Sequence, residues 1–549
     1  MSNAISSRRH DLDALRAGAM LLGIVLHVAL AYDPAIPWPI RDVSQSDLFS
    51  LLMHWIHGFR MPLFFCLSGF FTAMLWRKRG LKSLLGHRVK RILVPLVIGA
   101  LTIVPLTNYA TEWSIQRQSS APAAGQDIWT AARLGHVAAV EQMIQDGQDP
   151  NEPDPTFKAS PLAMAATFDQ AGVVTKLLEL GADPNQRDSN GSTALHSATM
   201  FGCGQSAEQL IDAGADLSLE NNDGMTVKTL LSFDVSLSMT IASAFQIPVD
   251  AEQLIDGRKR IAAKLGVELP ETMTTEGTRG ADAMGWIVWL LIGPVLHHLW
   301  FLWFLCWLVV AFIGYAWIAP AIGLQRIWSP LVTSPLRYLY LVPVVMVGEL
   351  LMAQSFGPDT SIGLLPLPHI LAYYSVFFFF GVLYYDVLAQ VPEGSEERVG
   401  KYWWLTLPLA TVAFVIGVDI HTGLFGWFVQ LDPTAKWLAG ALFESLYAWL
   451  MIFGLIGVFR WAFRSENRTL RYISDSSYWL YLAHMPLVIM VHGLTASWPI
   501  PSAIKFVTIC VAISAFLLVT YEYGVRYTPI GRLLNGPRKR PGKLLAETS

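Results

Sequence analysis

The chain has 549 residues, of which 53% are hydrophobic, 12% aromatic and only 15% charged, a balance that few soluble proteins of this length have. Its formal net charge of −3 gives no reason to expect a nucleic-acid partner, and membrane lipid is the expected main solvent. The four cysteines (Cys66, Cys203, Cys306 and Cys510) lie far apart, which argues against a disulfide framework and a cysteine-based metal site.

Apolar segments long enough to cross a membrane as helices recur along the chain. The first is too long for the core of a signal peptide and lacks a cleavage motif, so it is expected to remain as an anchor. The sequence therefore predicts an all-α fold, a polytopic bundle of about ten transmembrane helices. The expected spans are residues 12–32, 48–75, 92–109, 298–318, 334–353, 367–387, 402–419, 437–459, 475–494 and 503–523.

The distribution of basic residues predicts the orientation of the bundle. Lys and Arg near the ends of spans resist translocation. The loops expected outside the membrane hold few of them, namely Arg41, Lys436 and Lys505. Both termini are therefore predicted to be cytoplasmic. The cytoplasmic basic residues are Arg8 and Arg9, those from Arg77 to Arg91, Arg326, Arg398, Lys401, those from Arg460 to Arg471, and those from Arg526 to Lys543.

A polar stretch between the third and fourth spans repeats itself at about 33 residues, the period of ankyrin repeats. Gly147, Gly181 and Gly214 recur at that period, and Gly191 to Ala198 matches the ankyrin turn-and-helix signature. The pattern predicts about three to four repeats that stack as a helical solenoid on the outer side of the membrane. His196 is expected to tie down a turn of this stack and to have no catalytic role.

These features divide the chain into four expected parts. Residues 1–111 and 284–526 form the two parts of a membrane domain. Residues 112–283 are the inserted ankyrin repeats with their connector, and residues 527–549 are a basic cytoplasmic tail.

Ionisable residues inside spans are costly in lipid and are therefore candidates for function. Arg16 and His27 are 11 residues apart, which places both on one helix face, separated by roughly 16 Å. His54 and His57 share a face of the second span and approach the depth of His27. Arg60 lies one turn deeper and needs an anionic partner. Glu349, Glu444 or a bound ligand are the candidates for that partner.

Two further groups of polar residues are less specific. Arg88 and Arg91 precede the third span, where they are most simply a topological anchor, and phosphate binding is the alternative. His298 begins the fourth span and His484 lies near the middle of the ninth.

Five motifs carry a resemblance through their order and spacing. They are Leu12-Asp13-Ala14-Leu15-Arg16 with ten residues before His27, Phe59-Arg60-Met61-Pro62-Leu63 leading to Ser68-Gly69-Phe70, Arg88-x-x-Arg91 before Pro95, His298-Leu299-Trp300-Phe301, and Ser477-Tyr478-Trp479-Leu480-Tyr481 followed by His484-Met485-Pro486. Together they resemble the acyltransferase family 3 membrane O-acyltransferases, in particular the branch with the periplasmic glucan succinyltransferases. The ankyrin insertion departs from this family.

The resemblance implies a multi-pass protein of the bacterial inner membrane, surrounded by lipid. It also implies transfer of an acyl group, acetyl or succinyl, from cytoplasmic acyl-coenzyme A to a carbohydrate hydroxyl outside the membrane. Acyl-coenzyme A is then a substrate, and no permanently bound cofactor and no metal is expected. The ankyrin repeats are expected to hold a protein partner or to screen access to the site.

The resemblance also assigns expected roles to residues. His27 accepts the proton of the hydroxyl, and Arg16 positions the donor. The remaining catalytic candidates are His54 and His57, which together with Arg60 orient the acceptor or stabilise the oxyanion. The expected donor-binding residues are Arg88, Arg91 and Arg60, and the expected substrate contacts are His298 and Ser68.

Two rival functions remain open on the sequence. Several imidazoles at one depth would suit a metal transporter, although no carboxylate or thiolate accompanies them at ligand spacing. A membrane receptor or channel could instead use the ankyrin repeats to sense a partner, although no repeated pore segment is present.

Overall fold

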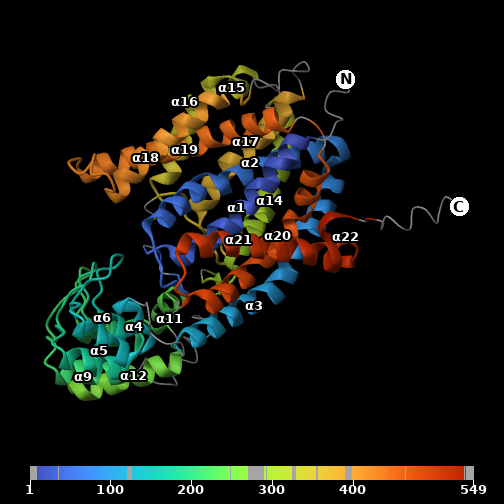
Figure 1. The fold of residues 1–549 in the computed structure, drawn as a ribbon. Helices are drawn as coiled ribbons and strands as arrows, with labels where there is room; N and C mark the ends of the chain where they lie inside the picture. Colours follow the sequence, from blue (N-terminus) through green and yellow to red (C-terminus); the bar gives the residue numbers. More distant parts are fainter. Residues whose placement is uncertain are drawn as a thin grey trace.

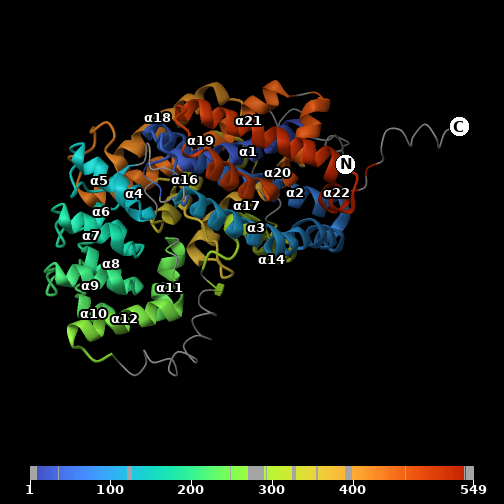
Figure 2. The same ribbon diagram turned by 60° about the horizontal axis from the view of Figure 1, so that its bottom comes forward.

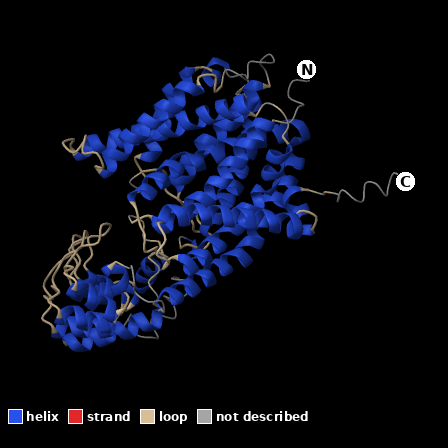
Figure 3. Cartoon of the chain, in the orientation of Figure 1, coloured by secondary structure: helices blue, strands red, loops and turns tan. Residues whose placement is uncertain are grey.

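The protein is described here by a computed structural model. It describes residues 9–119, 127–269, 290–323, 329–389, 399–536 and 538, apart from positions 35, 37, 246, 248, 292, 354–355, 464 and 466. These residues form helices and loops without a strand (Figure 3), which confirms the all-α fold class.

Each of the ten predicted spans falls on a helix of the membrane domain. Several of these helices contain Pro or Gly. A membrane helix tolerates these residues because neighbouring helices can satisfy the backbone groups that they leave unpaired. Their bounds are α1 (His10–Ala29), α2 (Asp47–Arg88), α3 (Val94–Ser119), α14 (Trp300–Ala321), α16 (Tyr338–Glu349), α17 (Pro368–Leu388), α18 (Trp403–Thr422), α19 (Pro433–Ala462), α20 (Arg468–Thr495) and α21 (Ser502–Thr520).

Within the described residues, seven helical segments are long and apolar enough to cross a membrane, and one of them joins α2 to α3. Two helices that fall on predicted spans are not among these seven segments. They are α16, which has only 12 residues, and α20, whose sequence is rich in polar residues. The chain is thus a membrane protein, and the number of ten spans stays a prediction. The basic segment expected as a loop after the second span is instead a continuation of α2, interrupted only at Gly80, whose φ is 75°.

Side-chain contacts define one end of the bundle, and the inserted helices mark the other. At one end Asp11 at the start of α1 lies 3.4 Å from Arg460 near the end of α19. The short helix α22 (Pro529–Asn535) packs at the same end, where its Leu534 carbonyl accepts a hydrogen bond from Arg91. The inserted helices α4 to α12 lie at the opposite end (Figure 1). This arrangement agrees with the predicted placement of the termini and the insertion on opposite sides.

The inserted helices stack as an ankyrin solenoid (Figure 2). Asp127 caps the first helix by accepting from the Thr130 amide at 2.6 Å. The helices are α4 (Ile128–Leu134), α5 (Val137–Gln145), α6 (Pro161–Thr167), α7 (Ala171–Glu179), α8 (Ala194–Phe201), α9 (Gly204–Asp212), α10 (Val227–Leu231), α11 (Val235–Ala244) and α12 (Ala251–Leu265). The connector expected after the repeats begins with α12, which packs against α8 and α9 of this stack. We call α4 to α12 the ankyrin module.

His196 connects two repeats of the module. Its Nδ1 accepts from the Thr193 amide at 3.2 Å, and its Nε2 lies 3.0 Å from the Leu219 carbonyl of the next turn. Burial lowers the pKa of His196 below its ordinary value because the charged ring loses hydration. A neutral ring that donates from Nε2 and accepts at Nδ1 satisfies all these contacts, so the role of His196 is structural.

The ankyrin module contacts the outer loop that directly follows α1. Thr156 Oγ1 donates to the Pro34 carbonyl at 3.1 Å, and Arg133 donates to the Pro39 carbonyl at 3.4 Å. The module therefore lies beside the outer end of the helix that carries His27.

Several predicted features lie outside the described residues. They are Arg8, Arg326, Arg398, the connector beyond residue 269 and the basic tail beyond Arg538.

Candidate active site

A small cavity inside the bundle brings together side chains from α1, α2, α14 and α20. Its volume is about 40 Å³, which is room for one or two water molecules or the reacting atoms of a substrate. The polar groups around it are three imidazoles, one guanidinium and one phenol, and the walls are otherwise apolar. The lining residues are Met20, Gly23, His27, Arg60, Met61, Phe64, His298, Trp300, Phe301, Tyr481 and His484.

His27 is held by a second histidine. Its Nδ1 lies 2.8 Å from Nε2 of His484. Nδ1 of His484 lies 2.8 Å from the Tyr481 carbonyl, and because a carbonyl can only accept, this nitrogen carries the hydrogen. In the neutral pair, Nε2 of His484 is then the acceptor and Nδ1 of His27 the donor. The network leaves Nε2 of His27 with a free lone pair.

Arg60 lies against α1 one turn below His27. A Cβ atom placed on Gly23 would come within 2.6 Å of Nη1 of Arg60, so only glycine lets the guanidinium approach the helix this closely. Gly23 and His27 are four residues apart and share a helix face. The guanidinium and the imidazole therefore line the same cavity.

The carboxylates considered as partners of Arg60 lie elsewhere. Glu444 accepts from the Gly357 amide at 3.0 Å and lies 2.5 Å from Nε2 of His421, while Glu349 lies against Glu444 and Tyr373. Among the described residues, no acidic side chain pairs with Arg60, and its buried Nε has no hydrogen-bond partner. Of the three candidates, a bound ligand is the one that this geometry favours.

His298 closes another side of the cavity. Nε2 of His298 lies 3.2 Å from the Leu482 carbonyl. The backbone carbonyl of His298 accepts a hydrogen bond from the Tyr481 hydroxyl at 2.6 Å. Its buried Nδ1 has no hydrogen-bond partner within the described part of the chain. His298 thus lines the cavity with one ring nitrogen that has no partner among the described residues.

Arg16 and His27 both face α20, as their spacing predicts. Arg16 donates to Ser474 Oγ at 3.0 Å and lies 3.4 Å from Asp13. Ser474 and His484 are ten residues apart on α20, nearly the separation of Arg16 and His27 on α1. One face of α1 thus carries the arginine near the N-terminal end of the helix, which is the predicted cytoplasmic end, and the imidazole deep in the bundle.

Arg16 belongs to a group of cations at this end. Arg88 donates to Thr72 Oγ1 at 2.5 Å, Arg91 donates to the Leu534 carbonyl at 2.8 Å, and the charges of both interact with that of Arg16. The Nε of Arg88 has no partner among the described residues. Asp13 pairs with Arg16, whereas Arg88 and Arg91 have no carboxylate partner among the described residues. The excess of positive charge suits an anion such as phosphate.

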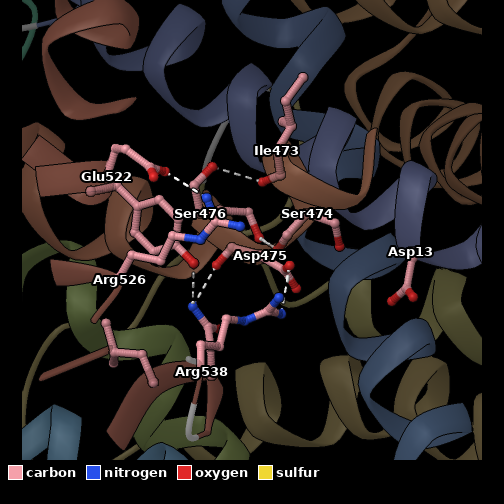
Figure 4. A network of polar contacts seen from close by, with 12 residues as sticks. Asp13, Ile473, Ser474, Asp475, Ser476, Glu522, Arg526 and Arg538 are labelled. Atoms are coloured by element: carbon pink, nitrogen blue, oxygen red, sulfur yellow. Dashed lines mark hydrogen bonds and ion pairs between the residues drawn. The ribbon is translucent and has the colours of Figure 1, made fainter. Parts of the chain in front are cut away.

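Figure 4 shows the start of α20 beside Arg526 and Arg538 of the C-terminal segment. Asp475 is already occupied, since Arg538 lies 2.6 Å from its carboxylate, and Arg526 pairs with Glu522 at 2.7 Å. Figure 4 shows Asp13 on the neighbouring helix, apart from these pairs. The nearby acids thus have their own basic partners.

Besides Arg16, Arg88 and Arg91, three of the residues predicted for the site do not line the cavity. His54 bonds to the Ser50 carbonyl at 2.7 Å, and His57 bonds to the Pro358 carbonyl at 2.9 Å. Ser68 lies nearer the cytoplasmic end, where its carbonyl accepts from Thr72 at 2.6 Å. Sequence spacing placed these residues at the right depth or in the right motif but could not give the direction in which each side chain points.

Reasoning from the sequence gave no role to His484, Tyr481 or Gly23. The available signal was an ionisable residue in the middle of a span, His484, within a motif that also contains Tyr481. No set of three or more His, Cys, Asp or Glu side chains in the described ranges is arranged to hold a metal ion.

Comparison with known proteins adds two family matches. A family model described as an acyltransferase domain matches residues 9–130 and 270–521, and a model of ankyrin repeats in three copies matches residues 128–221. The ankyrin repeats predicted from the sequence are thereby confirmed.

Curated relatives match a shorter part of the chain. Proteins named glucans biosynthesis protein C from Salmonella paratyphi B, Salmonella heidelberg and Salmonella gallinarum are each 38% identical over 106 residues. This is 19% of the chain, and it spans only about a quarter (26%) of the length of these relatives.

Proposed function

Because the chain belongs to the acyltransferase domain family, we propose that it is a membrane O-acyltransferase that moves an acetyl or succinyl group from acyl-coenzyme A to a carbohydrate hydroxyl. The observation that supports this most directly is the cavity that His27, held in one tautomer by His484, shares with Arg60. Arg60 has no acidic partner in the part of the chain that the structure describes. The names of the partial relatives support a glucan as the acceptor.

In the proposed reaction, Nε2 of His27 takes the proton of the acceptor hydroxyl as its oxygen attacks the thioester carbon. A C–O bond forms, and the carbonyl π electrons move onto the oxygen. Arg60 stabilises that oxyanion, because the guanidinium is a cation fixed in a site from which bulk water is excluded. Collapse of the intermediate breaks the C–S bond, and the imidazolium returns its proton to the leaving thiolate.

The donor would reach this cavity from the cytoplasmic side. Phosphates of the coenzyme would bind Arg88, Arg91 and Arg16, and the thioester would extend along the face of α1 toward His27. Arg16 and His27 are 11 residues apart, so a helical rise of about 1.5 Å per residue separates them by roughly 16 Å along the axis. An elongated donor with anionic groups at one end and the reactive group at the other fits this separation.

The direct test is His27→Ala in a protein whose insertion into the membrane has been verified. We expect glycan acylation, measured by mass spectrometry of glycans from cells with and without the gene, to fall by about 100-fold or more. His369→Ala is the matched control, since that histidine lies in the first turn of α17 and does not line the cavity. Undiminished acylation in the His27 variant would contradict the proposal.

A further inference from the structure

A second, larger cavity lies on the flank of the membrane domain between α16, α18 and α19. Its volume is about 400 Å³. Most of its wall is aliphatic or aromatic, and the polar exceptions include Arg337 and Thr406, each with a buried side-chain atom that lacks a hydrogen-bond partner in the described structure. The apolar side chains include Leu405, Leu409, Val412, Leu446, Leu450 and Phe453.

Arg337 is deeply buried at one end of this cavity. Only 4% of its surface is exposed, and its guanidinium lies 3.9 Å from the centroid of the Phe453 ring. Its one direct contact with a backbone acceptor is a long hydrogen bond of 3.4 Å to the Val332 carbonyl. No carboxylate pairs with it in the described ranges, and its Nε is unpartnered.

A buried guanidinium in this state favours binding of an anion. Desolvation of a cation is costly unless an opposite charge or several hydrogen bonds compensate for it. The face of Phe453 and the phenol of Tyr338 supply part of that compensation, but neither balances the positive charge as an anionic oxygen would. The cavity is thus complementary to a ligand with an anionic oxygen at one end and an apolar body.

The position of the cavity indicates where such a ligand comes from. Arg337 directly precedes α16, and Tyr402 lies just before α18 with Lys401 5.6 Å above its ring. Both helix ends are on the predicted cytoplasmic side. Along α18, Leu405 and Val412 are 44% and 54% exposed on the outer flank of the bundle, so the cavity opens sideways toward lipid.

We propose that this cavity is a binding site for an anionic phospholipid of the cytoplasmic leaflet. The phosphate contacts Arg337, and an acyl chain lies along the apolar side chains of α18 and α19. Basic pockets between membrane helices on the cytoplasmic side favour anionic headgroups in this way. The site is separate from the cavity of His27, and the proposal does not depend on the transferase activity.

The test uses the full chain, purified in detergent and stripped of lipid, with phosphatidylglycerol as the probe. Binding of the lipid to the folded state should raise the melting temperature as its concentration increases, and native mass spectrometry should count the bound lipid. For Arg337→Gln we expect the apparent affinity to fall by at least about tenfold, as for the loss of a charge-assisted hydrogen bond.

Four comparisons make this test decisive. Leu409→Trp fills the cavity and leaves Arg337 in place, so it should also weaken binding, whereas Arg532→Gln removes an exposed cation of α22 and should not. Phosphatidylcholine and soluble glycerol phosphate should each fail to reproduce the effect. An equal response to either of them, or an Arg337 variant that binds as the unmodified protein does, would overturn the proposal.

Discussion

At the scale of single residues, the reactivity of His27 depends on a neighbour in space. An imidazole can act as a base only through the nitrogen that lacks a hydrogen, and the partner of the other nitrogen decides which one that is. His484 accepts from Nδ1 of His27 because its own Nδ1 is committed to the Tyr481 carbonyl. His484 is thus a positioning residue in the proposed mechanism.

Replacement of His484 tests this role. His484→Met keeps the volume but removes the acceptor, so we expect kcat to fall by roughly 100-fold with little change in KM. His484→Gln retains an acceptor near the same position and should restore much of the loss. The pH profile of kcat/KM should change in the Met variant, since His27 is then free to change tautomer. Equal activity of the two variants would show that His484 only fills space.

At the scale of secondary-structure elements, two helices of the membrane domain cross at backbone contact. A Cβ atom on Gly69 of α2 would lie only 1.8 Å from the Phe378 carbonyl of α17, and one on Gly381 of α17 would lie 1.9 Å from the Cys66 carbonyl of α2. Small residues allow membrane helices to approach this closely. The contact fixes α2, and with it the position of Arg60.

We therefore expect Gly69→Ala to destabilise the protein by about 1–3 kcal/mol, the usual cost of overpacking. Gly86→Ala is the control within the same helix, because a Cβ atom there would meet nothing within 4 Å and alanine favours a helix. Thermal unfolding of the two purified variants in one detergent provides the measurement. A Gly69 variant as stable as the Gly86 variant would show that α2 and α17 do not cross as described.

At the scale of the whole molecule, the ankyrin module and α22 lie at opposite ends of the membrane domain (Figure 1). Arg91 bonds to the Leu534 carbonyl of α22. The module contacts the loop after α1 through Thr156 and Arg133. The proposed donor site, with Arg88 and Arg91, lies at the other end. The proposed transfer across the membrane needs donor and acceptor sites on opposite sides, and this arrangement is compatible with that proposal.

Cysteine labelling tests the orientation. In a cysteine-free background, Ser218→Cys in the module and Arg532→Cys in α22 both place a thiol at an exposed position. An impermeant maleimide added to intact spheroplasts should label the first and spare the second. Labelling of both sites only after lysis, or labelling of Arg532→Cys alone in intact spheroplasts, would contradict the predicted topology.

The features that the sequence by itself determined are those set within one segment. Hydropathy over about 20 residues located the membrane helices, and a period of about 33 residues identified the ankyrin repeats. The helical repeat placed Arg16 and His27 on one face, and both reach α20. Such periodicities depend only on the geometry of the element that contains them.

Contacts between elements were decided by the tertiary structure alone. His27 and His484 are 457 residues apart in the chain, Arg60 reaches the cavity because Gly23 leaves space for it, and Arg337 is buried by helices that follow it in sequence. His54 and His57 lie at a similar depth but point elsewhere. The physical reason is that the rotation and crossing of each packed helix decide which side chains meet, and local spacing contains no information on either.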